Sequence, residues 1–184
     1  MKRNEFLSSA CTLGLCSCAG LSVVSGNTLS AGDDDSKKKE TDWRIGFMQK
    51  RFAGLIQSLG SNVDEQTRIK ILESIGRTCA KENAEALKKY KDNPEGFLAD
   101  IKEKWAENTE IDSKEKKIRI IGKKEPACFC PFVDQSLTPK HFCQCSLGNM
   151  KETFESILGK PVDATIEESI LRGGERCTFV IRYA

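Results

Sequence analysis

The segment Ser146–Arg182, with the sequence SLGNMKETFESILGKPVDATIEESILRGGERCTFVIR, contains the patterns that decide the fold. Its first part carries apolar residues at three- and four-residue spacing between Leu147 and Leu158. This spacing predicts an amphipathic helix, and Gly159 and Pro161 predict its end.

Two strands are predicted after this helix. Val162, Ala164 and Ile166 alternate with polar residues, as in a strand that is half buried. The Arg-Gly-Gly sequence at 172–174 predicts the turn of a hairpin, and Cys177–Arg182 predicts the returning strand. A helix followed by a hairpin indicates a helix packed on a small antiparallel sheet.

Apolar stripes at helical spacing also predict that the first half of the chain is helical. One helix ends at Gly60, a second covers about Asp64–Ala80, a third is short, and a fourth begins at Asn93 and Pro94, which form a cap and a first turn. The residues expected to be buried on these helices are Ile45, Met48, Phe52, Leu55, Ile56, Leu59, Ile69, Leu72, Ile75, Cys79, Ala84, Leu87, Tyr90, Phe97, Leu98, Ile101 and Trp105.

After a polar stretch at 107–117, the sequence Lys117–Ile121 predicts another strand, and a long loop over Lys123–Gln144 follows. We therefore predict an α+β fold, with N-terminal helices packed with a small antiparallel β-sheet and one long C-terminal helix. The predicted organisation is an export signal at 1–31, a charged linker at 32–41 and a single α+β domain at 42–184.

The N-terminal segment has the features of an export signal. Lys2 and Arg3 precede an uncharged, weakly apolar stretch, and the start resembles a twin-arginine signal in which Asn4 replaces the second arginine. Leu15-Cys16-Ser17-Cys18 resembles a lipobox that would lipidate Cys18, whereas small residues at 30–31 offer ordinary cleavage instead. We favour the lipobox, and we expect an exported protein that is either periplasmic or a membrane-anchored lipoprotein.

The charge of the chain excludes one class of partner. Basic and acidic residues nearly balance, with a net charge of +2, and aromatic residues are sparse and scattered. Neither a basic surface nor a stacking platform is therefore predicted, which argues against a nucleic-acid partner. Contact with a membrane is expected only through a lipid anchor, and the expected partner is a small ligand or a metal.

The central candidate site is a set of four cysteines in two C-x-C pairs, Cys128-Phe129-Cys130 and Cys143-Gln144-Cys145. In extended backbone, residues i and i+2 point to the same side, so each pair can direct both sulfurs to one point. We expect the following helix to begin at Ser146, which leaves Cys143 and Cys145 just outside it. Its N-terminus would lower the pKa of nearby thiols.

Three interpretations of the cysteines remain open. Four converging thiolates would hold a structural zinc or an iron–sulfur cluster. An even number of cysteines in an exported protein also fits a disulfide framework, which we rank second. The third interpretation is a catalytic or ligand-binding thiol, for which His141 or Asp134 would handle the proton. Cys79 and Cys177 are expected either in the core or facing the four-cysteine site.

Several features of the C-terminal third resemble known families. They are a helix with Gly148 and Phe154, then Gly159-Lys160-Pro161-Val162, Glu167-Glu168-Ser169, and the ending Gly173-Gly174-Glu175-Arg176-Cys177-Thr178-Phe179. With these features, Cys143–Tyr183 resembles the small-molecule-binding domain of the 4-vinyl reductase family and the 2-amino-thiazoline-4-carboxylate hydrolase family. The Cys128–Phe132 loop resembles the hydrolase family and its uncharacterised cysteine-rich relatives. Ser169 stands where the reductase pattern often has another cysteine.

The resemblance implies helices against an antiparallel sheet, with a pocket that binds small ligands, hydrocarbon-like groups or metals. It implies Cys177 as a ligand-binding position. Apart from the resemblance, Cys79 is a second candidate for ligand binding, because it could face the cysteine cluster if its helix packs there. Our first hypothesis is an exported cysteine-rich domain that binds a metal, a cofactor or a small ligand. The alternatives are an amidine- or thiazoline-type C–N hydrolase, using a cysteine or a metal-activated water, and a disulfide-stabilised extracytoplasmic module without a ligand.

Overall fold

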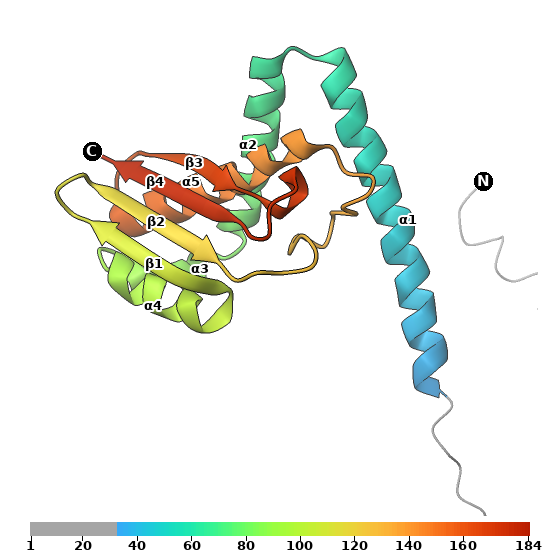
Figure 1. Cartoon of the computed structure of the whole chain (residues 1–184), viewed down its shortest axis with the longest axis horizontal. Coiled ribbons are helices and arrows are strands. Elements are labelled where there is room, and N and C mark those ends of the chain that lie inside the picture. Colours follow the sequence, from blue (N-terminus) through green and yellow to red (C-terminus); the bar gives the residue numbers. More distant parts are fainter. Residues whose placement is uncertain (1–32) are drawn as a thin grey trace, which may run out of the picture.

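The computed structural model describes the backbone of residues 33–184 and the side chains of residues 43–184. In this part of the chain, helices occupy the first half, and the sheet is completed in the second half (Figure 1). The elements are α1 (Asp33–Asn62), α2 (Glu65–Lys81), α3 (Ala84–Leu87), η1 (Lys88–Tyr90), α4 (Pro94–Lys104), β1 (Ala106–Asp112), β2 (Lys117–Gly122), η2 (Lys140–Phe142), α5 (Cys143–Leu158), β3 (Val162–Glu168), η3 (Ile170–Arg172) and β4 (Thr178–Tyr183), where η denotes a 3-10 helix.

The four strands form one sheet in the order β1-β2-β4-β3, and all neighbouring strands are antiparallel. Within it, Ile181 lies opposite Ile118 on β2 and opposite Ala164 on β3. The predicted α+β class, the antiparallel sheet and the long C-terminal helix α5 are therefore confirmed. The β3–β4 connection is longer than a tight turn, because η3 precedes Gly173, which has a φ of 98°.

The main core lies between one face of the sheet and helices α4 and α5. Phe154 of α5 is fully buried there, and its ring meets the ring of Phe97 edge-to-face at 5.6 Å between centroids. Burial of large aromatic side chains contributes much of the stability of such a core. The fully or largely buried members of this core are Leu98, Ile101, Ala106, Ile118, Ile120, Leu147, Phe154, Ala164, Phe179 and Ile181.

Helices α2 and α5 cross at two glycines. A side chain on Gly76 would collide with the carbonyl oxygen of Cys145, and one on Gly148 would collide with the backbone of Glu73. Charged side chains join the helices on both sides of this crossing, because Lys151 pairs with Glu73 at 3.0 Å and Arg77 pairs with two glutamates of α5. The crossing therefore fixes where the first turn of α5 lies.

The polar stretch after α4, for which no element was predicted from the sequence, forms strand β1. Its sequence, AENTEID, lacks the regular apolar alternation that marks the other strands, and most of its side chains are exposed. The strand exists because it pairs with β2, in register from Asn108 with Ile121 to Asp112 with Lys117. An edge strand of this kind is stabilised by its neighbour more than by its own sequence.

Helix α1 begins at Asp33 and so includes the segment 33–41 that we predicted to be part of a charged linker. The predicted export signal, with its lipobox at Cys18 and the alternative cleavage site at 30–31, lies outside the described residues. Among the helices that the structure describes, none has both the length and the apolar character needed to cross a bilayer.

Candidate functional site

A second, smaller core lies under the loop that connects β2 to η2. We call residues 123–139 the cysteine loop, and the second core the cysteine-lined core. It is built from α1, α2, η2, α5, η3 and the loop itself. Its members are Ile56, Leu72, Val133, Phe142, Cys143 and Leu171, with Phe52, Leu59, Cys128, Cys130, Cys145 and Ile166 packed against them.

The first C-x-C pair has the geometry that the sequence predicts. Cys128 and Cys130 are half buried and pack against the cysteine-lined core, whereas Phe129 between them is 84% exposed. Side chains i and i+2 therefore point inward and the intervening side chain points outward, although the backbone bends at Phe129 and does not form a strand. This part of the loop contributes two thiols to the interior.

The second pair lies inside α5, which begins at Cys143 and not at Ser146. The reason is that η2 runs directly into α5, with Phe142 in the N-cap position. Two residues apart in a helix, the side chains of Cys143 and Cys145 are separated by about 200°. The expectation that this pair lies just outside the helix is therefore wrong, and its thiols diverge.

Each thiol of the second pair has its own surroundings. Cys143 is buried, and its Sγ lies 3.1 Å from Oγ of Ser169, which is also buried. Cys145 is half buried beside α2, near the crossing at Gly76. The serine that replaces a cysteine in the reductase pattern is thus a hydrogen-bond partner of Cys143.

The remaining two cysteines lie near the same region. The charge of Cys79 affects the pKa of Cys130 and Cys145, and that of Cys128 affects the pKa of Cys177. All six cysteines within residues 43–184 are free thiols. Cys79 is exposed, so its predicted burial on the α2 stripe is wrong, but it lies near enough to Cys130 and Cys145 for its charge to affect their pKa. Within the described residues, no three histidine, cysteine or acidic side chains are grouped as metal ligands would be.

Burial determines the protonation of these thiols. It raises the pKa of Cys128, Cys130 and Cys177, and with the neighbouring Cys130, Cys79 and Cys143 it raises that of Cys145 to about 12. The predicted lowering of the pKa at the helix N-terminus is therefore wrong for Cys145, since desolvation outweighs it. These four groups are neutral thiols near pH 7, and neutral thiols are poor nucleophiles and poor metal ligands.

His141 and Asp134 have structural contacts. His141 Nε2 lies 3.2 Å from the backbone oxygen of Ile56, and its ring packs where a Gly60 side chain would be, so it anchors α1 to η2. Asp134 accepts hydrogen bonds from the backbone N–H and the hydroxyl of Ser136, at 2.9 and 2.6 Å, and these bonds lower its pKa. Their proposed roles in proton transfer remain predictions.

An apolar groove lies where α1 passes the cysteine loop. Its volume is about 300 Å³, and nearly all the surface that lines it is apolar. The amide of Gln49 closes one side by donating to the backbone oxygen of Pro131 at 2.9 Å. The residues that line the groove are Arg44, Ile45, Met48, Gln49, Pro131 and Phe132.

Aromatic rings connect this groove to the cysteine-lined core. Phe132 of the loop lies 5.2 Å from Phe52 of α1, and Phe52 lies 5.0 Å from Phe142, measured between ring centroids. A molecule in the groove would therefore contact a continuous apolar surface that leads to the buried thiols.

The groove was not predicted from the sequence, because Ile45 and Met48 continue the apolar stripe of α1 and were expected to be core. They are 47% and 56% exposed, since the helix extends past the loop that would cover them. The position of Ile45 and Met48 could have indicated the groove, because they precede Phe52 by one to two helical turns and face a loop that contains prolines. A separate hollow of about 530 Å³ at the β1–β2 hairpin is lined by residues of both charges, such as Glu110, Lys114 and Arg119.

No protein-family model matches the chain, and no curated protein matches it. Among solved structures, trafficking protein particle complex subunit 3 from Naegleria fowleri, covalently bound to palmitic acid, is 11% identical with a TM-score of 0.50, over 78% of this chain and 96% of that chain. The phenol-responsive sensory domain of the transcription activator PoxR, with phenol, is 12% identical with a TM-score of 0.51, over 73% of this chain and 74% of that chain.

The likeness is one of fold. A vinyl-4-reductase family protein from Methanocaldococcus jannaschii also matches, at 14% identity over 84% of both chains, but with a TM-score of 0.30. That TM-score is too low to carry the reductase resemblance that we noted in the sequence, which stays a prediction.

Proposed function

We propose that the protein binds a small apolar ligand in the groove between α1 and the cysteine loop. The observation that carries this proposal is the nearly wholly apolar lining of the groove, which is formed by side chains that would otherwise face water. Exposed concave apolar surface costs free energy unless something covers it, and a fitting ligand gains that free energy on binding.

The dimensions and chemistry of the groove suggest the class of ligand. A volume of about 300 Å³ is at the lower end of the range for small-molecule sites, and suits a single ring or part of an acyl chain. Met48 can adapt to ligands of different shape because its side chain is unbranched and polarisable.

Two of the structural neighbours support this class, since one holds palmitic acid and the other is described with phenol. Both molecules are small and largely apolar, as the groove requires. Their identity with this chain is too low for the ligands themselves to carry over, so the proposal rests on the groove and takes only the class from the neighbours.

A zinc or iron–sulfur site at Cys128, Cys130, Cys143 and Cys145 remains an alternative prediction. It would require the loop pair to move toward one of the divergent helix thiols and several neutral thiols to lose protons. Element analysis of the purified protein together with thiol counting tests it directly. The hydrolase and the disulfide-stabilised module also remain predictions, and no contact among the described residues favours either over ligand binding.

Ligand binding is tested by fluorescence titration with an anilinonaphthalene sulfonate probe, followed by displacement with palmitate and with phenol. We expect Met48→Glu to raise the concentration of palmitate or phenol needed to displace the probe by about tenfold or more, because the substitution puts a charge into the apolar groove. The matched control is Leu55→Glu, which lies on the same helix with the same 56% exposure but outside the groove lining. Equal losses in the two variants, or no displacement from the wild-type protein, would contradict the proposal.

A further inference from the structure

We propose that the outward face of α1 binds the surface of an anionic lipid bilayer. This outward face consists of Trp43, Phe47 and Arg51, with Arg44 and Lys50 at its border. The inference concerns the opposite side of α1 from the contacts with the cysteine-lined core and does not depend on the apolar ligand.

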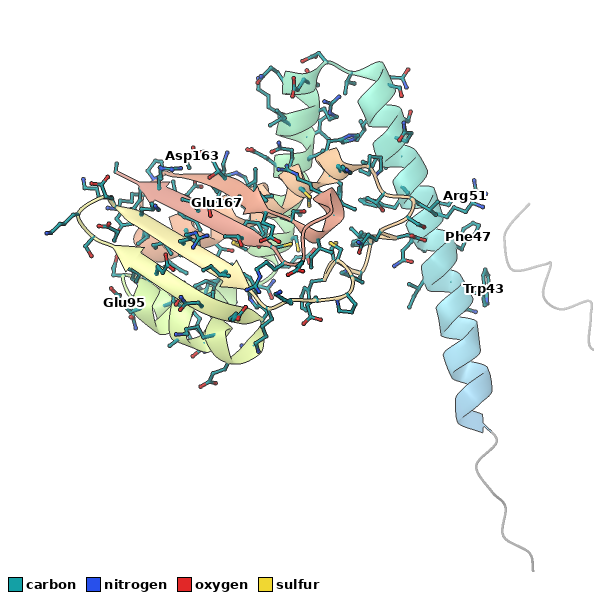
Figure 2. All side chains as sticks on the ribbon, viewed as in Figure 1. Trp43, Phe47, Arg51, Glu95, Asp163 and Glu167 are labelled. Carbon is teal, nitrogen blue, oxygen red and sulfur yellow. The ribbon has the colours of Figure 1, made fainter. Side chains whose placement is uncertain are left out.

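The outward face follows from helical spacing. Trp43, Phe47 and Arg51 are four residues apart, and Figure 2 shows all three on the side of α1 that points away from the sheet. The contacts with the body come from other residues of the helix, since Phe52 and Ile56 pack into the cysteine-lined core. Trp43 is 60% exposed and Phe47 48% exposed, although both are large aromatic residues.

The side chains of this face are arranged in one row. The rings of Trp43 and Phe47 meet edge-to-face at 6.4 Å between centroids. The guanidinium carbon of Arg51 lies 5.1 Å from the Phe47 ring, and that of Arg44 lies 5.8 Å from the Trp43 ring. Aromatic rings flanked by cations match the boundary of a bilayer, where rings enter the acyl edge and cations stay among the phosphates.

The charge of this part of the helix is complementary to anionic lipid. From Trp43 to Val63 the sequence contains Arg44, Lys50 and Arg51 and no acidic residue, although the whole chain has a net charge of only +2. Each basic residue near an anionic surface contributes about 1 kcal/mol of attraction. The basic character is therefore local to the part of α1 from Trp43 onward, whereas residues 33–42 of the same helix contain five acidic and three basic residues.

The same charges disfavour a second copy of the chain as the occupant. A two-fold contact through the outward face would bring the three basic residues of each copy against those of the other. A bilayer supplies the opposite charge instead. Lipidation at Cys18, if it occurs as predicted, would act on the same bilayer, and two weak membrane contacts together give stable attachment.

The test uses the full chain, translated in vitro without lipid-modifying enzymes, and vesicles of phosphatidylcholine with or without phosphatidylglycerol. Because the chain has two tryptophans, Trp105→Phe leaves Trp43 as the reporter. We expect anionic vesicles to shift the emission of Trp43 to shorter wavelength, and brominated lipid to quench it. Raising the salt concentration should reverse both effects.

Matched variants distinguish binding through the outward face from non-specific binding of exposed apolar side chains to vesicles. We expect Phe47→Ser to lower vesicle partitioning roughly tenfold, whereas Phe129→Ser, at the more exposed aromatic residue of the cysteine loop, should change it little. The double change Lys50→Glu with Arg51→Glu should abolish the preference for anionic vesicles. The same charge change at Lys70 and Lys102, on α2 and α4, should retain most of it.

Three outcomes would overturn the proposal. In the first, the chain sediments with vesicles while Trp43 keeps the emission and quenching of a water-exposed indole, so that only the N-terminal segment binds. In the second, the emission of Trp43 depends on protein concentration without lipid, which would indicate a second copy. In the third, neutral vesicles bind as well as anionic ones.

Discussion

The molecule has two cores of different construction. The core between the sheet and α4 and α5 is formed by regular elements, whereas the cysteine-lined core is covered by an irregular loop and by the middle of α1. The first contains fully buried rings such as Phe154, and the second contains thiols that remain half buried. The comparison indicates that the first core holds the fold together, while the groove proposed for the ligand lies beside the second core.

The largest expected effect tests the first core. We predict that Phe154→Ala lowers the free energy of unfolding by about 3–5 kcal/mol, because it removes a fully buried ring from contact with Phe97 and the sheet. Denaturant unfolding followed by circular dichroism measures the change. The equivalent truncation at the exposed Phe129 should cost less than about 0.5 kcal/mol. If both variants lose a similar amount of stability, the main core is not the chief source of the free energy of unfolding.

Local sequence signals predicted most of the first core. Asn93 caps α4 by accepting the N–H of Gly96 at 3.0 Å, and Gly159 ends α5 with a φ of 65°, as their residue types indicate. Such signals act over three or four residues, and the sequence displays them directly. Strand β1 was not predicted, because its own polar residues do not show a strand pattern. The strand forms through its pairing with β2 in the sheet.

The second core was predicted only in part, because tertiary packing determines it. That Cys128 and Cys130 share one side was predicted, but the chain achieves this with a bend at Phe129 and not with extended backbone. The start of α5 was not, since Ser146 is a good local cap but the chain is already helical from η2. Likewise, the exposure of Cys79 and Ile75 depends on which face of α2 meets α5 at Gly76, and periodicity alone does not specify that face.

The second prediction concerns the thiols and compares the edge of the cysteine-lined core with its interior. Alkylation of Cys145 at pH 7.5 should be slower than that of the exposed Cys79 by about fiftyfold or more, because burial raises the pKa of Cys145 to about 12. Mass spectrometry of proteolytic peptides resolves the two sites. In denaturant the rates should become equal. Fast alkylation of both residues in the native protein would indicate that the second core opens readily.

The third prediction tests the crossing that joins the two cores. Gly148→Ala should lower the free energy of unfolding by about 1–3 kcal/mol, because the added methyl group collides with backbone atoms of Glu73, which cannot easily move away. The matched control is Gly54→Ala on α1, where nothing lies within 4 Å of the added methyl group. There the better helix propensity of alanine should stabilise the protein by up to about 1 kcal/mol. Tolerance of alanine at Gly148 would mean that the helices lie further apart.

The smallest expected effect is a pH dependence at the same crossing. The hydrogen bond from Arg77 lowers the pKa of Glu155 below its ordinary value of 4.5, with the positive charge of Arg77 adding to it. A carboxyl group whose pKa is lower in the folded state stabilises the fold above its unfolded pKa, and this stabilisation disappears as the pH falls through the folded pKa.

Glu155→Gln should therefore lower the free energy of unfolding by under about 1 kcal/mol at pH 7, where the ion pair is partly exposed, and by progressively less as the pH falls below 4.5. Thermal unfolding between pH 3 and pH 7 measures the difference between the two proteins. Glu95→Gln is the control, because Glu95 lies in the first turn of α4, away from the crossing. The difference in stability between the wild-type and Glu155→Gln proteins should become smaller on acidification. If it does not, the α2–α5 crossing is stabilised by its glycines and apolar contacts alone, and the ion pairs beside it contribute nothing.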